Sequence, residues 1–75
     1  MYVVTIYVEE REESASKIQE ILTQYGENIM ARLGVNDSNE ERNSVILVLY
    51  QQEDVKEFVK TLKMIKGIRV NYMEI

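Results

Sequence analysis

The chain has 75 residues, of which 45% are hydrophobic and 29% are charged, and its formal net charge is −4. This composition is typical of a soluble globular protein, and the length predicts a single domain over residues 1–75 that buries only about 60% of its unfolded surface. The lack of histidine and cysteine excludes disulfides, thiolate or imidazole metal sites and Ser-His or Cys-His catalysis. The acidic balance disfavours direct nucleic-acid binding. No signal-peptide pattern or membrane-length apolar run is present, so we expect a cytoplasmic protein with no membrane partner.

A strand and a helix are predicted first. Residues 2–8 are largely apolar at both odd and even positions, which predicts a strand covered on both faces. The acidic run of residues 9–13 then leads into a helix expected from about Arg11 to Tyr25. The apolar residues of this helix recur at intervals of three and four and predict one buried stripe: Ala15, Ile18, Ile21, Leu22 and Tyr25. Gly26 is expected to end the helix in the left-handed conformation.

The next two strands differ in pattern. Residues 29–35 alternate, which predicts a strand with one buried face made by Ile29, Ala31, Leu33 and Val35. Residues 36–44 are polar and predict a long hairpin loop. Val45–Tyr50 is apolar throughout and rich in β-branched residues, which predicts a strand in the middle of a sheet.

A second helix and a last strand complete the chain. Asp54 and Glu57 have the spacing of a capping box at the start of this helix. Its predicted buried stripe consists of Val55, Phe58, Val59, Leu62 and Ile65. Gly67 is expected to close the helix, and residues 68–73 alternate as an edge strand would.

This order predicts an α+β fold of the ferredoxin-like type. Two strand–helix–strand units interleave as a βαββαβ sandwich, with a four-stranded antiparallel sheet and two helices on one face. The first and third strands are the most apolar, and this fold places them in the centre. Because the helices cover only one face, the other must expose apolar side chains or hide them against a partner. The candidate ligand-binding or interface residues are Tyr7, Met30, Val48 or its neighbour Leu47, Tyr50 and Met73.

Few other chemistries fit the sequence. Glu9, Glu10, Glu12 and Glu13 could hold a hard cation, but their spacing matches no EF-hand loop and a solvated helix start explains them better. No glycine-rich phosphate motif is present. Neither a metal nor a cofactor is expected. Tyr7 and Tyr50 could line a small-ligand site, although packing in an oligomer interface is the favoured explanation for both.

Four stretches carry a family resemblance: Val4–Glu12, Ile29–Val35, Val45–Tyr50 and Ile65–Val70. Through them the chain resembles the small ACT-like proteins of the iron-only hydrogenase system regulator family. The resemblance implies a ferredoxin-like fold, self-association through sheet surfaces and a regulatory role near hydrogenase assembly.

The chain departs from related patterns at several positions. Asn36 and Asp37 stand where family members often have proline and an aromatic residue, and Lys63 stands where a glycine is expected. The fold is also similar to the effector domain of nickel-responsive regulators, but nickel sensing does not carry over without histidine and cysteine. An amino-acid site of the ACT type does not carry over either, since Glu9 and Glu10 would repel a carboxylate.

Three functions compete on this evidence. The favoured one is a regulatory or ligand-sensing module that works as a homo-oligomer, a dimer or tetramer, with an unidentified small-molecule effector. The alternative is a protein-binding adaptor subunit without a small-molecule ligand, using the apolar face or the edge strand that contains Tyr72. An enzyme acting through Glu9, Glu10 or Tyr7 is the least favoured.

Overall fold

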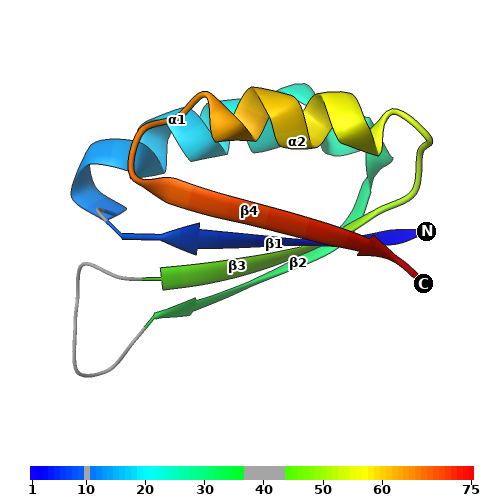
Figure 1. Cartoon of the computed structure of the whole chain (residues 1–75), viewed down its shortest axis with the longest axis horizontal. Helices are drawn as coiled ribbons and strands as arrows, with labels where there is room; N and C mark the ends of the chain where they lie inside the picture. The colour runs from blue at the N-terminus through cyan, green and yellow to red at the C-terminus, as the bar shows by residue number, and fades with distance from the viewer. Residues whose placement is uncertain (10, 37–43) are drawn as a thin grey trace.

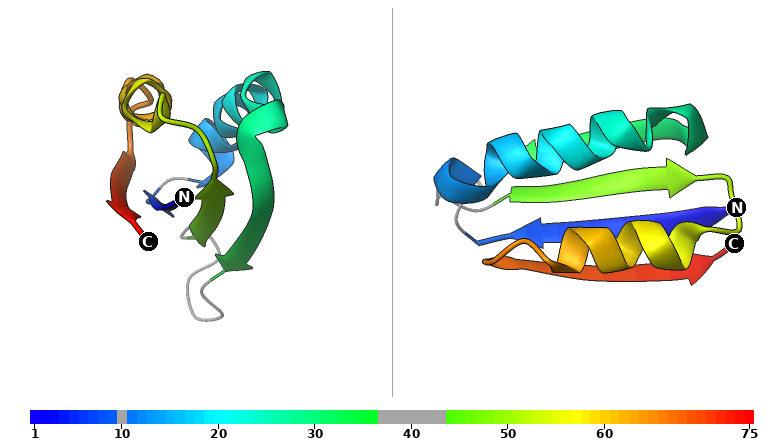
Figure 2. Two further views of the ribbon diagram at one scale, coloured as in Figure 1. Left: turned by 90° about the vertical axis from the view of Figure 1, so that its right-hand side faces the viewer. Right: turned by 90° about the horizontal axis from the view of Figure 1, so that it is seen from above.

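Two strand–helix–strand units follow one another in the computed structural model, which describes residues 1–9, 11–36 and 44–75, with side chains for 1–9, 14–35 and 44–75. The elements are β1 (Tyr2–Val8), α1 (Arg11–Gln24), a 3-10 turn (Gly26–Asn28), β2 (Ile29–Asn36), β3 (Ser44–Tyr50), α2 (Val55–Lys63) and β4 (Ile68–Glu74). Both helices lie on the same side of the sheet (Figures 1 and 2). The predicted βαββαβ order is confirmed. Only the ends of the predicted hairpin loop are described, as strand residues, and residues 37–43 lie outside the described ranges.

The four strands form one sheet in the order β2-β3-β1-β4. Every neighbouring pair is antiparallel, and β1 and β3 occupy the centre as their apolar sequences predict. Ile6 lies opposite Ile46 of β3 on one side and opposite Val70 of β4 on the other. The strand that opens the chain is therefore paired along both of its edges.

The core fills the space between the helices and the sheet. Its fully buried side chains include an aromatic stack in which the rings of Phe58 and Tyr50 lie 4.6 Å apart at an angle of 11°. The Tyr25 ring lies 5.1 Å from Phe58 on the α1 side. The other members of the core are aliphatic: Val4, Ile6, Val8, Ile18, Leu22, Val48, Val55, Val59, Leu62, Ile65 and Val70.

The first helix differs from its predicted stripe at one position. Ile18 and Leu22 are buried, and Ile21 and Tyr25 pack against the core from its margin. Ala15 is exposed, and Ser14 is buried in its place. The Ser14 hydroxyl donates a hydrogen bond to the Lys66 carbonyl oxygen at 3.2 Å, so a polar side chain fits the interior by joining α1 to the connection before β4.

The predicted buried face of β2 is wrong beyond Ile29. A β-bulge lies between Ile29 and Ala31, where the register with β3 shifts. A bulge adds one residue to a strand, so the side chains that follow change faces. Ala31, Leu33 and Val35 consequently lie on the sheet face away from the helices, and all three are exposed.

Two of the predicted helix ends also differ. Asp54 precedes α2, but its side chain makes no capping hydrogen bond, and the predicted capping box does not form. Gly26 begins the 3-10 turn without a positive φ, whereas Gly67 does adopt the left-handed region, at φ 87°. The backbone carbonyl of Gly67 accepts a hydrogen bond from the Glu9 amide at 3.0 Å, which fixes the entry into β4 against the end of β1.

Substitution of Gly67 by alanine is expected to destabilise the protein by about 1–2 kcal/mol, because a Cβ is disfavoured in the left-handed region. Urea unfolding followed by circular dichroism measures the change. Gly34→Ala is the matched control, since Gly34 has no positive φ and a Cβ added there meets no atom within 4 Å. Equal stability of the two variants would contradict the prediction.

Candidate functional site: the open face of the sheet

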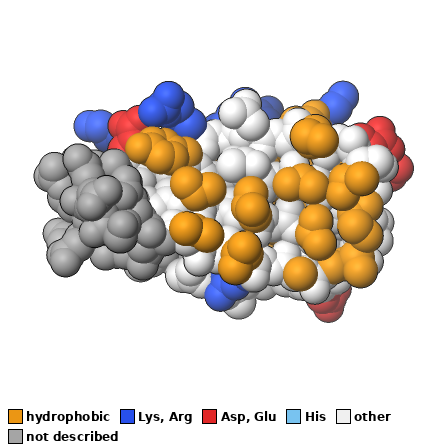
Figure 3. Space-filling view, turned by 90° about the horizontal axis from the view of Figure 1, so that it is seen from below, with side chains coloured by type: hydrophobic (Ala, Val, Ile, Leu, Met, Phe, Trp, Pro, Cys, Tyr) orange, Lys and Arg blue, Asp and Glu red, His pale blue; other side chains and the backbone are white. Residues whose placement is uncertain are grey.

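The sheet face that the helices leave uncovered is called here the open face. Side chains alternate along a strand, so the residues between the buried core positions must point to this side. Its members are Val3, Thr5, Tyr7, Ala31, Leu33, Val35, Val45, Leu47, Leu49, Arg69, Asn71 and Met73. Figure 3 shows hydrophobic side chains spread over most of this surface.

The centre of the open face is apolar and shallowly hollowed. Leu33 of β2 pairs with Leu47 of β3, and Ala31 pairs with Leu49. Leu33 is 59% exposed and Leu47 is 38% exposed, which are large fractions for leucine side chains within a sheet. A hollow of about 340 Å³ opens between these residues, and Val3 and the Arg32 position of β2 complete its lining. This surface is continuous across three strands.

A polar corner adjoins the apolar area at the β4 side. The Arg69 guanidinium carbon lies 5.0 Å from the centre of the Tyr7 ring, and its Nη2 atom lies 2.9 Å from Oε1 of Glu9. Both charged side chains are well exposed, so this ion pair adds little to stability. With Thr5 and Asn71, the Tyr7 and Arg69 side chains surround a second hollow of about 230 Å³.

The structure separates the predicted site residues. Tyr7 lies half-buried on the open face, and Met30 is exposed at the bulge of β2. Val48 and Tyr50 are fully buried on the helix side, so their predicted place on a shared uncovered surface is wrong. Leu47, the alternative to Val48, lies on the open face opposite Thr5 of β1. Met73 also lies there and is exposed.

The Tyr50 hydroxyl is part of a hydrogen-bonded group inside the domain. It donates to Oδ1 of Asp54 at 2.9 Å and accepts from Nδ2 of Asn28 at 3.4 Å. The pKa of Tyr50 is raised to about 12, chiefly by burial; the bond from Asn28 lowers it and the bond to Asp54 raises it. Asp54 therefore holds the end of β3 instead of capping α2. The sequence hints at this hydrogen bond only in that Asp54 follows Tyr50 by four residues.

Alkaline pH is expected to destabilise the protein through Tyr50. The folded pKa of about 12 lies above the ordinary value of about 10, so the native state holds the proton more tightly than the unfolded chain does. This stabilisation is complete below pH 10 and is lost as the pH rises towards 12. Tyr50→Phe should lose about 1 kcal/mol at neutral pH and show a shallower fall in stability through the alkaline range. Urea unfolding at several pH values measures the free energy of unfolding of both proteins. The same dependence on pH for the unchanged protein and for Tyr50→Phe would contradict the prediction.

Metal binding finds no support in the part of the chain that the structure describes, where no three carboxylates gather into a possible metal site. Of the acidic run proposed from the sequence, Glu9 pairs with Arg69, and the side chains of residues 10–13 lie outside the described ones. No helix within the described ranges is both long and apolar enough to cross a membrane.

Comparison with protein families identifies the relatives of the chain. The family model described as "TM1266-like: Iron-only hydrogenase system regulator, putative" matches residues 1–72. The chain belongs to this family. The TM1266-like fold is shared by a solved structure described as "uncharacterized protein TM1266 from Thermotoga maritima", with a TM-score of 0.83 and 31% identity over 96% of this chain and 91% of that one. The family resemblance read from the sequence is confirmed.

Two more distant structures share the fold alone with this member of the TM1266-like family. One is a "putative antibiotic biosynthesis monooxygenase" from Deinococcus radiodurans, with a TM-score of 0.54, 12% identity and coverage of 100% of this chain and 92% of that one. The other is a formyltetrahydrofolate deformylase from Pseudomonas putida KT2440, with a TM-score of 0.61, 9% identity and coverage of 99% and 28%. Comparison with curated proteins gave no match.

Proposed function

We propose that this protein is a small ACT-like regulatory or ligand-sensing module of an iron-only hydrogenase system, and that it acts as a homo-oligomer and not as an enzyme. The observation that carries the proposal is the apolar open face, which continues across β1, β2 and β3. A small soluble domain rarely leaves such a surface uncovered unless another protein binds there.

A second copy of the chain suits this surface. Two sheets can pack face to face at about 10 Å, with the side chains of their inner faces interdigitating. In a dimer with two-fold symmetry the same patch serves on both subunits, so the Leu33 and Leu47 area of one copy meets an equally apolar area of the other. A 75-residue domain also gains from association, because its own core is small.

A regulatory role agrees with the side chains that the chain possesses. It has no histidine or cysteine to serve as nucleophile or general base near neutral pH. The pKa of Tyr50 is raised away from neutrality, and its hydroxyl is engaged with Asp54 and Asn28 on the helix side of the sheet. These properties favour binding over catalysis.

Light scattering coupled to gel filtration, followed by native mass spectrometry, tests the proposal. We expect one discrete oligomer, a dimer or tetramer, at micromolar concentration. A bound small molecule would add mass to the native protein and would be lost on denaturation. This observation would support the sensing role and allow the ligand to be identified. A monomer at all accessible concentrations would contradict the proposed assembly.

A further inference from the structure

A further recess lies on the helix side of the sheet, between α1 and the edge strand β2. It is called here the α1–β2 cleft. It has a volume of about 250 Å³. Its walls include Ala15, Ile18 and Gln19 from α1, Gly34 from β2, and Ser44 and Ile46 from β3. The cleft is separate from the open face, because the sheet itself lies between them.

The bulge of β2 explains why this space is not filled. After the bulge, Arg32 pairs with buried Val48 and Gly34 pairs with Ile46, so both residues occupy helix-facing positions. An apolar side chain would ordinarily fill the core at such positions, but glycine has none and arginine is charged. Among the described residues the fully buried core takes no side chain from β2. A Cβ built on Gly34 meets no atom within 4 Å, which shows that the space beside it is open.

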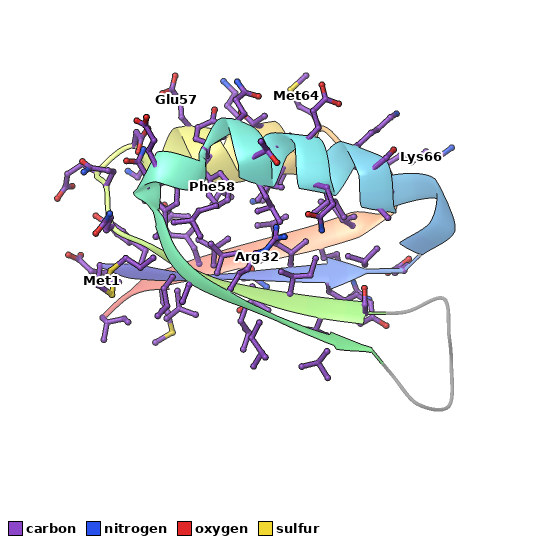
Figure 4. The ribbon with its side chains drawn as sticks, turned by 180° about the vertical axis from the view of Figure 1, so that it is seen from behind. Met1, Arg32, Glu57, Phe58, Met64 and Lys66 are labelled. Atoms are coloured by element: carbon purple, nitrogen blue, oxygen red, sulfur yellow. The ribbon has the colours of Figure 1, made fainter. Side chains whose placement is uncertain are left out.

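The cleft is lined by both aliphatic and polar residues. Its inner wall is aliphatic, with Ile18 and Ile46, whereas Gln19 contributes an amide and Ser44 a hydroxyl. Arg32 is not one of the residues that line the cleft, but it stands two residues before Gly34 on the same face of β2, and Figure 4 shows its side chain on the α1 side of the strand. The described residues include no ion pair of Arg32, and Arg32 is an exposed residue. An arginine beside an apolar recess is suited to a ligand with a carboxylate at one end.

We propose that the α1–β2 cleft binds a small monocarboxylate with a short aliphatic chain. The aliphatic part lies against Ile18 and Ile46 beside Gly34, and the carboxylate accepts hydrogen bonds from Arg32. The volume of about 250 Å³ lies below the range of about 300–1,000 Å³ found for drug-sized ligands, so the chain of the ligand is short. This inference rests on the sensing part of the proposed function and assigns a site and a ligand class to it.

Titration followed by two-dimensional NMR of the isotopically labelled protein tests the site directly. The probes are butyrate, isovalerate and hexanoate, with isoamyl alcohol as a probe that matches isovalerate in shape but lacks the charge. We expect saturable shifts of the amide signals of Ala15, Gln19 and Gly34 with at least one carboxylate, and a much weaker response to the alcohol. The absence of saturable shifts with all three carboxylates, or an equal response to the alcohol, would overturn the proposal.

Two variants separate the parts of the site. Gly34→Leu should fill the recess and abolish binding, because the position has room for a side chain and no positive φ. Arg32→Gln should weaken binding by about 10- to 100-fold, as expected for loss of a hydrogen bond to a charged group. Arg69→Gln removes the same charge from the open face and should leave the affinity unchanged. Equal weakening by the two arginine variants would overturn the role assigned to Arg32.

The same samples distinguish this inference from the assembly proposed above. Light scattering of each variant reports its oligomeric state while NMR reports binding. A monomer that binds isovalerate in the α1–β2 cleft would refute the assembly and support the cleft. A discrete oligomer without carboxylate binding would support the assembly and refute the ligand site in the cleft.

Discussion

Replacing Phe58 with alanine is expected to reduce the free energy of unfolding by about 3–5 kcal/mol. The Phe58 side chain is fully buried and lies between the rings of Tyr50 and Tyr25, as close as 4.6 Å to the first. Its removal leaves a cavity among two aromatic rings that hydrogen bonds hold in place, with Tyr50 bound to Asp54 and Tyr25 to Thr61. These tethers limit how far the site can collapse. A domain of this size has only about 5–15 kcal/mol of total stability, so the variant should lose a large fraction of it.

Thermal and urea unfolding, followed by circular dichroism, measure this effect. Met64→Ala is a matched control, since Met64 directly follows α2 and its side chain is 82% exposed. We expect the control to change stability by less than about 0.5 kcal/mol. A loss below about 1 kcal/mol for Phe58→Ala would mean that the aromatic stack does not organise the core.

Replacing Leu47 with lysine is expected to weaken self-association by about 100-fold or more. Leu47 lies on the central strand β3, between Thr5 of β1 and Leu33 of β2. In a face-to-face dimer both copies of this lysine would enter an apolar interface, where each charge would lose its water without gaining a partner. The monomer itself should tolerate the change, because the Leu47 side chain is already 38% exposed.

Sedimentation velocity over a range of concentrations measures the dissociation constant of this variant. Met64→Lys adds the same charge on the helix side of the molecule and should leave self-association unchanged. Circular dichroism confirms that each variant is folded. An oligomer of Leu47→Lys as stable as that of the unchanged protein would exclude the open face from the interface.

The sequence predicts the strand order better than it predicts which way each strand faces. Val45–Tyr50 and β1 are largely apolar at both odd and even positions, which correctly indicates central strands but leaves their two faces indistinguishable. The pattern therefore leaves open whether Val48 or Leu47 lies on the open face, and it wrongly places Tyr50 there. The pairing of Thr5 with Leu47 and of Val4 with Val48 resolves the choice, and such pairings appear only once the sheet is formed.

The alternation of β2 predicts the wrong buried face for a different reason. Its sequence is regular from Ile29 to Val35, and no glycine or proline marks the bulge after Ile29. The bulge places Leu33 on the open face and turns Gly34 towards α1. The open apolar face could thus be anticipated from β1 and β3 alone, whereas the α1–β2 cleft depends on a backbone irregularity that residue periodicity does not carry.

The pairing of β1 with both β3 and β4 has a consequence for how the molecule reaches its native state. Val3 must find Met73, almost the full length of the sequence away, before the sheet is complete. Such distant pairings slow folding, because a long loop closes before its contacts are gained. On the ribosome β1 emerges before both of its partners, and β4 is the later of the two. Until β4 arrives, β1 presents an unpaired apolar edge that can recruit strands from other chains.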